Sequence, residues 1–161
     1  GAPCGAPDHE LAGAEGMNAT IRKFGYPASL IGETAHWVVL LRPAQVTLGS
    51  LIIAAKSDAT GFGALPGECH TDLAETSRRA EAMLRTAVGY DRINWLMLMM
   101  VDPHVHFHVL PRYEGERSHG ALSLADAAWP GPPDLKSAIA LAEEQQTELI
   151  GWLRGLWNAT A

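Results

Sequence analysis

The chain is poor in cysteine and in basic residues, and each shortage narrows the classes of protein to which it can belong. Its 161 residues include two cysteines, Cys4 and Cys69, and neither lies in a Cys-x-x-Cys pair, so no zinc-finger or dithiol redox motif is visible. We expect two free thiols in a reducing compartment. Lysine and arginine number 12 against 18 aspartates and glutamates, which gives a net charge of −6. Broad binding to a nucleic-acid backbone requires a basic surface, so nucleic acid is not an expected partner.

Long hydrophobic runs are missing as well. No stretch approaches the roughly 20 apolar residues of a membrane helix, and the N-terminus lacks the basic region followed by an apolar region that marks a secretory signal. We therefore expect a cytoplasmic protein with no membrane partner. A length of 161 residues suits one domain with a hydrophobic core of its own.

Composition divides the chain into three segments. Residues 1–16 are rich in Gly, Ala and Pro without periodicity, which predicts a flexible tail that need not belong to the natural chain. Residues 17–113 carry the regular apolar patterns and form the expected core domain. Residues 114–161 form an expected C-terminal extension packed on this core, with an irregular Trp-Pro segment at 129–133 and a final helix at 143–157.

The apolar patterns of the core predict an α+β fold. Short β-branched runs predict strands at 30–34, 36–41 and 50–55. Between Gly67 and Gly89 apolar residues recur at steps of three and four, which is typical of an amphipathic helix that ends at Gly89. Together with the two strands described next, these elements predict an antiparallel sheet of about five strands, one helix packed on it and the C-terminal helix.

Two further strands are predicted next to each other. Residues 94–100 are almost wholly apolar, which favours a central strand buried on both faces. Asp102-Pro103 is a turn signal, and residues 104–111 follow it directly. We therefore expect an antiparallel hairpin with a connection of about two residues.

The most informative residues lie on the second of these strands. His104, His106 and His108 alternate with Val105 and Phe107. Successive side chains of a strand point to opposite faces, so the three imidazoles are expected to share one face while the apolar residues face a core. Packing alone rarely explains three histidines at this spacing, whereas imidazole serves as a base, a metal ligand or a nucleophile near neutral pH.

The run His-x-His-x-His, followed by Val-Leu-Pro-Arg at 109–112, resembles the signature of the histidine triad family of nucleotide hydrolases and transferases. The broader resemblance covers residues 24–113. It implies the same α+β sheet, a small-molecule nucleotide as substrate, and neither a cofactor nor a bound metal. It also implies a reaction in which attack on the α-phosphate of a nucleotide conjugate gives a nucleotidyl-histidine, which water then resolves.

The resemblance assigns a role to each histidine of the triad. His106 is the implied nucleophile, and the backbone carbonyl of His104 would hold its other ring nitrogen. His108 would contact the phosphate oxygens and the leaving group. The side chain of His104 would brace the site from behind.

The resemblance also implies a homodimer. The apolar stripes of residues 73–88 and 149–157 offer surface that a small domain would not bury alone.

The chain departs from the family pattern at the expected phosphate contacts. Ser50 stands where many members have a histidine; its hydroxyl can still hydrogen-bond an imidazole, and we expect it to face the back of His104. The short Asp102-Pro103 turn replaces a longer glycine-rich loop. Arg112 follows the triad, and its guanidinium suits a phosphate. Ser50 and Arg112 are therefore the expected substrate-binding residues, and the changed contacts predict a compact leaving group.

Two alternatives remain open. The missing phosphate-loop residues suit a catalytically weak nucleotide-binding or scaffold protein on the same fold. Histidines at alternate positions of a strand also bind zinc, copper or iron, which would make the imidazole face a metal site. No carboxylate or cysteine lies at a convincing spacing for that role.

Overall fold

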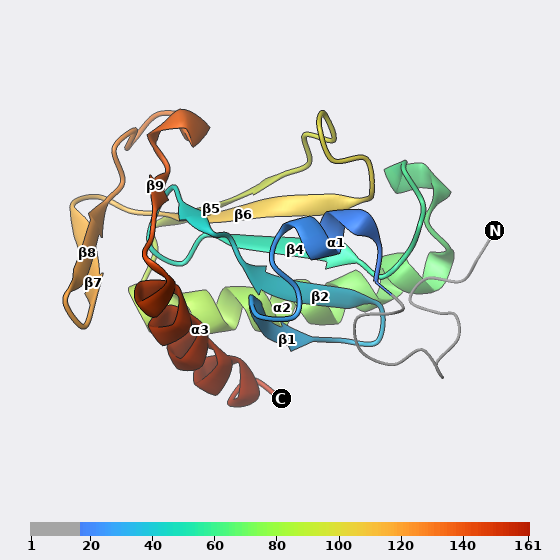
Figure 1. The fold of residues 1–161 in the computed structure, drawn as a ribbon, viewed down its shortest axis with the longest axis horizontal. Coiled ribbons are helices and arrows are strands. Elements are labelled where there is room, and N and C mark those ends of the chain that lie inside the picture. Colours follow the sequence, from blue (N-terminus) through green and yellow to red (C-terminus); the bar gives the residue numbers. More distant parts are fainter. Residues whose placement is uncertain (1–16) are drawn as a thin grey trace.

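The computed structural model describes residues 17–161, which form an α+β fold built on one five-stranded sheet (Figure 1). The strand order is β1-β2-β4-β6-β5, and every neighbouring pair is antiparallel. This confirms the predicted fold class, with its packed helix and its C-terminal helix. The flexible tail expected at residues 1–16 lies outside the described residues.

The elements of the described part follow one another in a simple order. They are α1 (Ala19–Lys23), β1 (Leu30–Glu33), β2 (Trp37–Leu41), β3 (Ala44–Gln45), β4 (Leu51–Ala55), η3 (Phe62–Ala64), α2 (Gly67–Val88), β5 (Arg92–Leu96), β6 (His106–Arg112), β7 (Glu116–His119), β8 (Leu122–Ala125), η4 (Leu135–Ser137), β9 (Ile139–Ala140) and α3 (Glu143–Asn158).

Both faces of the sheet are covered at its centre. One face packs against α2 and α3, and the other is closed by Ile21 of α1. All residues of β2 and β4 are therefore buried, which explains their continuous apolar runs. Ala54 pairs with His106 and Ile52 pairs with His108, so these two histidines lie on the face that α1 covers.

The helix predicted between Gly67 and Gly89 is confirmed. α2 ends at Val88, and Gly89 adopts a φ of 54°, the left-handed conformation that glycine takes without steric cost. Met83 and Leu84 of α2 are fully buried in the main core.

The final helix packs across β1 and α2. Its Leu149, Leu153 and Trp157 are buried. The indole of Trp157 lies directly on Gly32, where an added Cβ would clash with the ring. The apolar stripes of α2 and α3 are thus buried mainly in the chain's own core, so they leave little of the surface that was expected for a second copy.

The predicted short hairpin before the triad is wrong. β5 ends at Leu96 and β6 begins at His106, so residues 97–105 form a loop between them. Met99 adopts a φ of 54°, which a strand cannot accommodate, and Met100 is 85% exposed. β5 stands last in the strand order and so forms an edge of the sheet, and the apolar run that suggested a buried central strand continues into a solvent-facing loop.

Two expectations about the environment of the protein have different outcomes. Cys69 is buried and disulfide-bonded, so the expectation of free thiols is wrong for this residue, and the argument from it for a reducing compartment falls. Within residues 17–161, none of the helices has the length and apolar character of a membrane span. A cytoplasmic location stays a prediction.

Candidate active site

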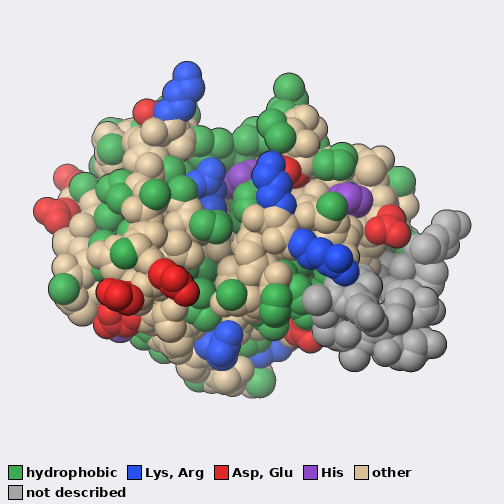
Figure 2. All heavy atoms as spheres, viewed as in Figure 1, with side chains coloured by type: hydrophobic (Ala, Val, Ile, Leu, Met, Phe, Trp, Pro, Cys, Tyr) green, Lys and Arg blue, Asp and Glu red, His purple; other side chains and the backbone are tan. Residues whose placement is uncertain are grey.

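A hollow of about 320 Å³ is lined by the imidazoles of His106 and His108. Both rings project from the same face of β6, with centroids 5.3 Å apart, and the residues are 2% and 8% exposed. The other walls come from the C-terminal end of α1, from Arg42 just after β2, from the loop of residues 97–105 and from Leu135 of η4. On the face drawn in Figure 2, histidine side chains lie beside lysine and arginine side chains. Strand alternation therefore brings two histidines together in a partly basic hollow.

The tautomer of His106 follows from one hydrogen bond. Its Nδ1 lies 2.7 Å from the carbonyl oxygen of His104. A carbonyl oxygen can only accept, so Nδ1 carries the proton and Nε2 keeps its lone pair in the neutral ring. The backbone contact that the resemblance implied is present, and it leaves His106 with the lone pair that a nucleophile needs.

His104 lies just before β6 and is held by α1. Its Nδ1 is 2.9 Å from the hydroxyl oxygen of Thr20. The same oxygen accepts, at 3.4 Å, from the backbone N–H of His104. Thr20 is 2% exposed. It therefore supports the first histidine from a buried position, the role that had been expected of Ser50.

Ser50 is buried but does not reach His104. Its hydroxyl donates to the carbonyl of Thr47 at 2.7 Å and accepts from the Thr47 N–H at 3.0 Å. It precedes β4, whose Leu51 pairs with Val109, so it lies beyond the opposite end of the triad. The expectation that Ser50 faces the back of His104 is wrong, and its hydroxyl instead closes the turn of residues 47–50.

His108 has a charged neighbour that sequence reasoning missed. Nε of Arg42 donates to Nδ1 of His108 at 3.2 Å, and the same guanidinium donates to the carbonyl of Ala44. Burial lowers the pKa of His108 to about 4, with the charges of Arg42 and His106 acting in the same direction and Asp102 opposing them. His108 is therefore neutral near pH 7. Burial also lowers the pKa of Arg42.

The remaining walls combine an aromatic ring with an ion pair. Phe24 lies 5.6 Å from the ring of His106 and 6.0 Å from that of His108, measured between centroids. Nζ of Lys23 donates to Asp102 at 2.6 Å and so links α1 to the loop before β6. Phe24, Lys23 and Arg42 were not identified as site residues from the sequence.

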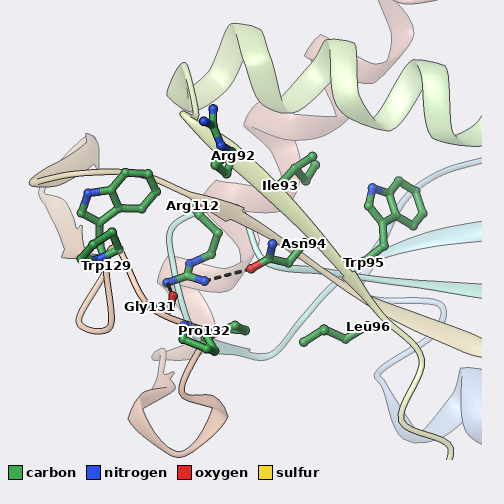
Figure 3. A pocket seen from close by; sticks show the side chains of 11 residues that line it. Arg92, Ile93, Asn94, Trp95, Leu96, Arg112, Trp129, Gly131 and Pro132 are labelled. Carbon is green, nitrogen blue, oxygen red and sulfur yellow. Dashed lines mark hydrogen bonds between the residues drawn. The ribbon is translucent and has the colours of Figure 1, made fainter.

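Arg112 belongs to a buried network beside this hollow. Its guanidinium forms a two-pronged pair with Asp126, at 2.7 and 3.1 Å, and donates to Asn94 and to the carbonyl of Gly131, both at 2.9 Å. It lines a second hollow, of about 760 Å³, together with Trp129 and Asn94 (Figure 3). It lies four residues beyond His108 on β6, about 13 Å at strand spacing. The structure therefore does not bring Arg112 to the triad. Its contacts instead link β6 to β5 and to the segment of residues 126–131, which is a structural role.

The donor groups around the triad also bear on metal binding. Within residues 17–161, no group of three or more His, Cys, Asp and Glu side chains is placed to hold a metal ion. Nδ1 of His108 faces a guanidinium, and Nδ1 of His106 is committed to a carbonyl.

Known proteins resemble this chain in structure. No protein-family profile and no curated protein matches it. A histidine triad protein from Marinobacter aquaeolei is 28% identical, with a TM-score of 0.64 over 82% of this chain and 90% of that one. A histidine triad protein from Sinorhizobium meliloti is 22% identical, with a TM-score of 0.66 over 85% and 93%. A hypothetical histidine triad nucleotide-binding protein from Sulfolobus tokodaii is 17% identical, with a TM-score of 0.65 over 87% and 90%.

The sequence motif, the site and these likenesses agree. His106 and His108 project from one face of β6, and the carbonyl of His104 meets the ring of His106. Together with the fold shared over most of each chain, this arrangement supports the resemblance of the protein to the histidine triad family.

Proposed function

We propose that the protein is a nucleotidyl hydrolase or transferase that acts on the α-phosphate of a nucleotide conjugate through His106. The observation that carries this proposal is the 2.7 Å contact between Nδ1 of His106 and the carbonyl of His104. It fixes the ring with its lone pair on Nε2, in a hollow that also holds the basic side chains of Lys23 and Arg42.

The proposed chemistry has two balanced steps. Nε2 of His106 attacks the α-phosphorus, the bond from phosphorus to the leaving group breaks, and the leaving group takes the electron pair and a proton from solvent water. The ring is then a cation bonded to phosphorus, and its Nδ1–H donates more strongly to the carbonyl of His104. Water, or the hydroxyl of another acceptor, then attacks the same phosphorus. The bond from phosphorus to Nε2 breaks, its electron pair returns to the now neutral ring, and the proton lost by the attacking hydroxyl or water passes to solvent.

The dimensions of the hollow favour a small substrate. Its volume of about 320 Å³ lies at the lower end of the range of about 300–1,000 Å³ for small-molecule sites. Phe24 and the apolar side chains of the loop before β6 offer a face for a base, while Lys23 offers charge to a phosphate. These features support a mononucleotide conjugate with a compact leaving group, such as a phosphoramidate, over a long dinucleoside polyphosphate.

Intact-mass spectrometry tests the reaction directly. The purified protein is mixed briefly with adenylylated and guanylylated substrates, including dinucleoside polyphosphates, phosphoramidates and adenosine phosphosulfate, and quenched. We expect an added nucleotidyl mass in the wild type and none in His106→Ala, which should also lose turnover. His106→Asn should still bind nucleotide, because the site is otherwise unchanged. Equal turnover in wild type and His106→Ala would remove His106 from the nucleophile role.

The same assay separates the alternatives. Nucleotide binding without an adduct or turnover would favour a nucleotide-binding or scaffold protein on this fold. The Sulfolobus tokodaii protein is named for nucleotide binding, and it is similar to this chain in fold. Stoichiometric metal in the purified protein would instead favour the metal-site alternative.

A homodimer is the second part of the proposal. Within residues 17–161, β5 is an edge of the sheet with no strand on its outer side, and Leu98, Met100 and Val101 are exposed in the loop that follows it. Unpaired edges and exposed apolar side chains are typical of surfaces that pair with another chain. We therefore place a second copy at this edge in preference to α2 or α3.

A further inference from the structure

Arg42 meets the third histidine in only one of the ring's two neutral forms. A guanidinium has N–H donors and no acceptor, so the 3.2 Å contact from Nε of Arg42 requires a lone pair on Nδ1 of His108. In a neutral imidazole the proton then sits on Nε2. The second bond of Arg42, to the carbonyl of Ala44, fixes the guanidinium to the backbone of its own turn.

The charged groups that face His108 come from the end of β2, from β6, from the loop before β6 and from α1. Arg42 approaches from the end of β2 and His106 from β6, and both disfavour a proton on the ring. Asp102, from the loop before β6, favours the proton but is itself paired with Lys23 of α1. Burial under Phe24 adds to the penalty on charge and is the largest cause of the low pKa of His108. The ring is therefore held neutral across the range above about pH 4.

We propose that Arg42 is a positioning residue of the active site, which keeps His108 neutral and protonated at Nε2 so that this ring donates a hydrogen bond to the phosphoryl oxygens or the leaving group of the substrate. The identity of that acceptor rests on the proposed function, whereas the protonation of His108 does not. His106 and His108 then hold opposite tautomers, one with a lone pair on Nε2 and the other with a proton there.

Losing Arg42 should affect turnover differently from losing a residue that only contacts the phosphate. Without it, His108 can place its proton on Nδ1 and present a lone pair to an anionic phosphate. Removing one hydrogen-bond donor from a developing charge slows turnover by roughly 10²–10³-fold. A basic residue that only attracted the substrate would act on KM, so the split between kcat and KM distinguishes the two roles.

Nitrogen NMR of histidine side chains tests the protonation without any substrate. The protein is labelled with ¹⁵N-histidine, and His108 is assigned by its loss in His108→Gln. In the wild type near pH 7 we expect a pyridine-type shift at Nδ1 and a pyrrole-type shift at Nε2. Arg42→Met should give averaged shifts from mixed tautomers and a higher titration midpoint, and Arg42→Lys should restore part of the wild-type pattern. Arg78→Met, at an exposed arginine paired with Glu75, is the matched control and should change neither.

Kinetics complete the test. Arg42→Met should lower kcat about 10²-fold with little change in KM, and Arg42→Lys should recover part of the rate. A pyrrole-type Nδ1 or a doubly protonated ring at His108 in the wild type near pH 7 would overturn the proposal without any variant, even if Arg42→Met did not fold. Unchanged shifts in Arg42→Met, or a rise in KM at constant kcat, would also overturn it. If no nucleotide adduct forms while the NMR pattern is as expected, the proposed function fails and the role of Arg42 in protonation stands.

Discussion

Acid should destabilise this protein in part through one histidine, and the effect can be isolated by replacing His108 with glutamine. In the folded protein the pKa of His108 is about 4, mainly because the ring is buried, against about 6.5 for a histidine in an unfolded chain. As pH falls below 6.5, the unfolded chain binds a proton that the folded protein refuses until about pH 4. Stability is therefore lost across this window, by about 3.4 kcal/mol at most, because the two pKa values differ by about 2.5 and each pKa unit corresponds to 1.36 kcal/mol. A typical domain has only about 5–15 kcal/mol in total.

Glutamine is a suited replacement because its carbonyl can accept from Arg42 and its amide can donate in place of Nε2, yet it does not titrate. Urea unfolding at a series of pH values from 7.5 to 4 gives the free energy of unfolding of both proteins. All other titrating groups are shared, so they cancel in the difference. We expect the wild type to lose stability relative to His108→Gln as pH falls, with most of the change between about 6.5 and 4. Parallel curves would refute the reasoning, because they would mean that His108 takes up its proton equally in both states.

Three further outcomes are expected. Arg112→Met should lower the free energy of unfolding by about 3–5 kcal/mol, because it leaves the buried Asp126 unpaired, while activity per folded molecule is retained; lost activity at full stability would instead make Arg112 a substrate residue. Thr20→Val removes the hydroxyl behind His104 and should cost about 1 kcal/mol in urea unfolding, with a smaller loss of turnover than His106→Ala causes; turnover equal to the wild type would separate α1 from the site. Light scattering at micromolar concentration should give twice the chain mass of 17.3 kDa, and the chain mass alone would count against a dimer.

The parts of the fold that could be predicted are those that depend on residues close together in the sequence. Alternation at 104–109 predicted the triad strand because side chains of a strand change face at every residue, and His106 and His108 do share a face of β6. The three- and four-residue period predicted α2, and Gly89 predicted its end, since both depend only on neighbours along the chain. The contact between the His104 carbonyl and His106 joins residues only two positions apart, so the resemblance of the motif was enough to predict it.

The parts that failed depend on distant segments. α1 has five residues, too few for a periodic pattern, and its Asn18 N-cap was its one local signal. Its Thr20 reaches His104 across 84 positions of the chain. The position of Ser50 depends on the register of β4 against β6, which pairs Leu51 with Val109, and sequence alone does not set a register.

The triad strand supplies the imidazoles, but groups outside their side chains place the protons on them. A backbone carbonyl can only accept, so it puts the proton of His106 on Nδ1, and a guanidinium can only donate, so Arg42 takes the lone pair of His108 at Nδ1. Two neighbouring rings of the same strand thereby offer opposite functions at Nε2, a lone pair and an N–H. The motif records which rings are present and not which nitrogen is protonated. For this reason a change at Arg42, 66 positions away from His108, should alter the chemistry of the site while the three histidines stay in place.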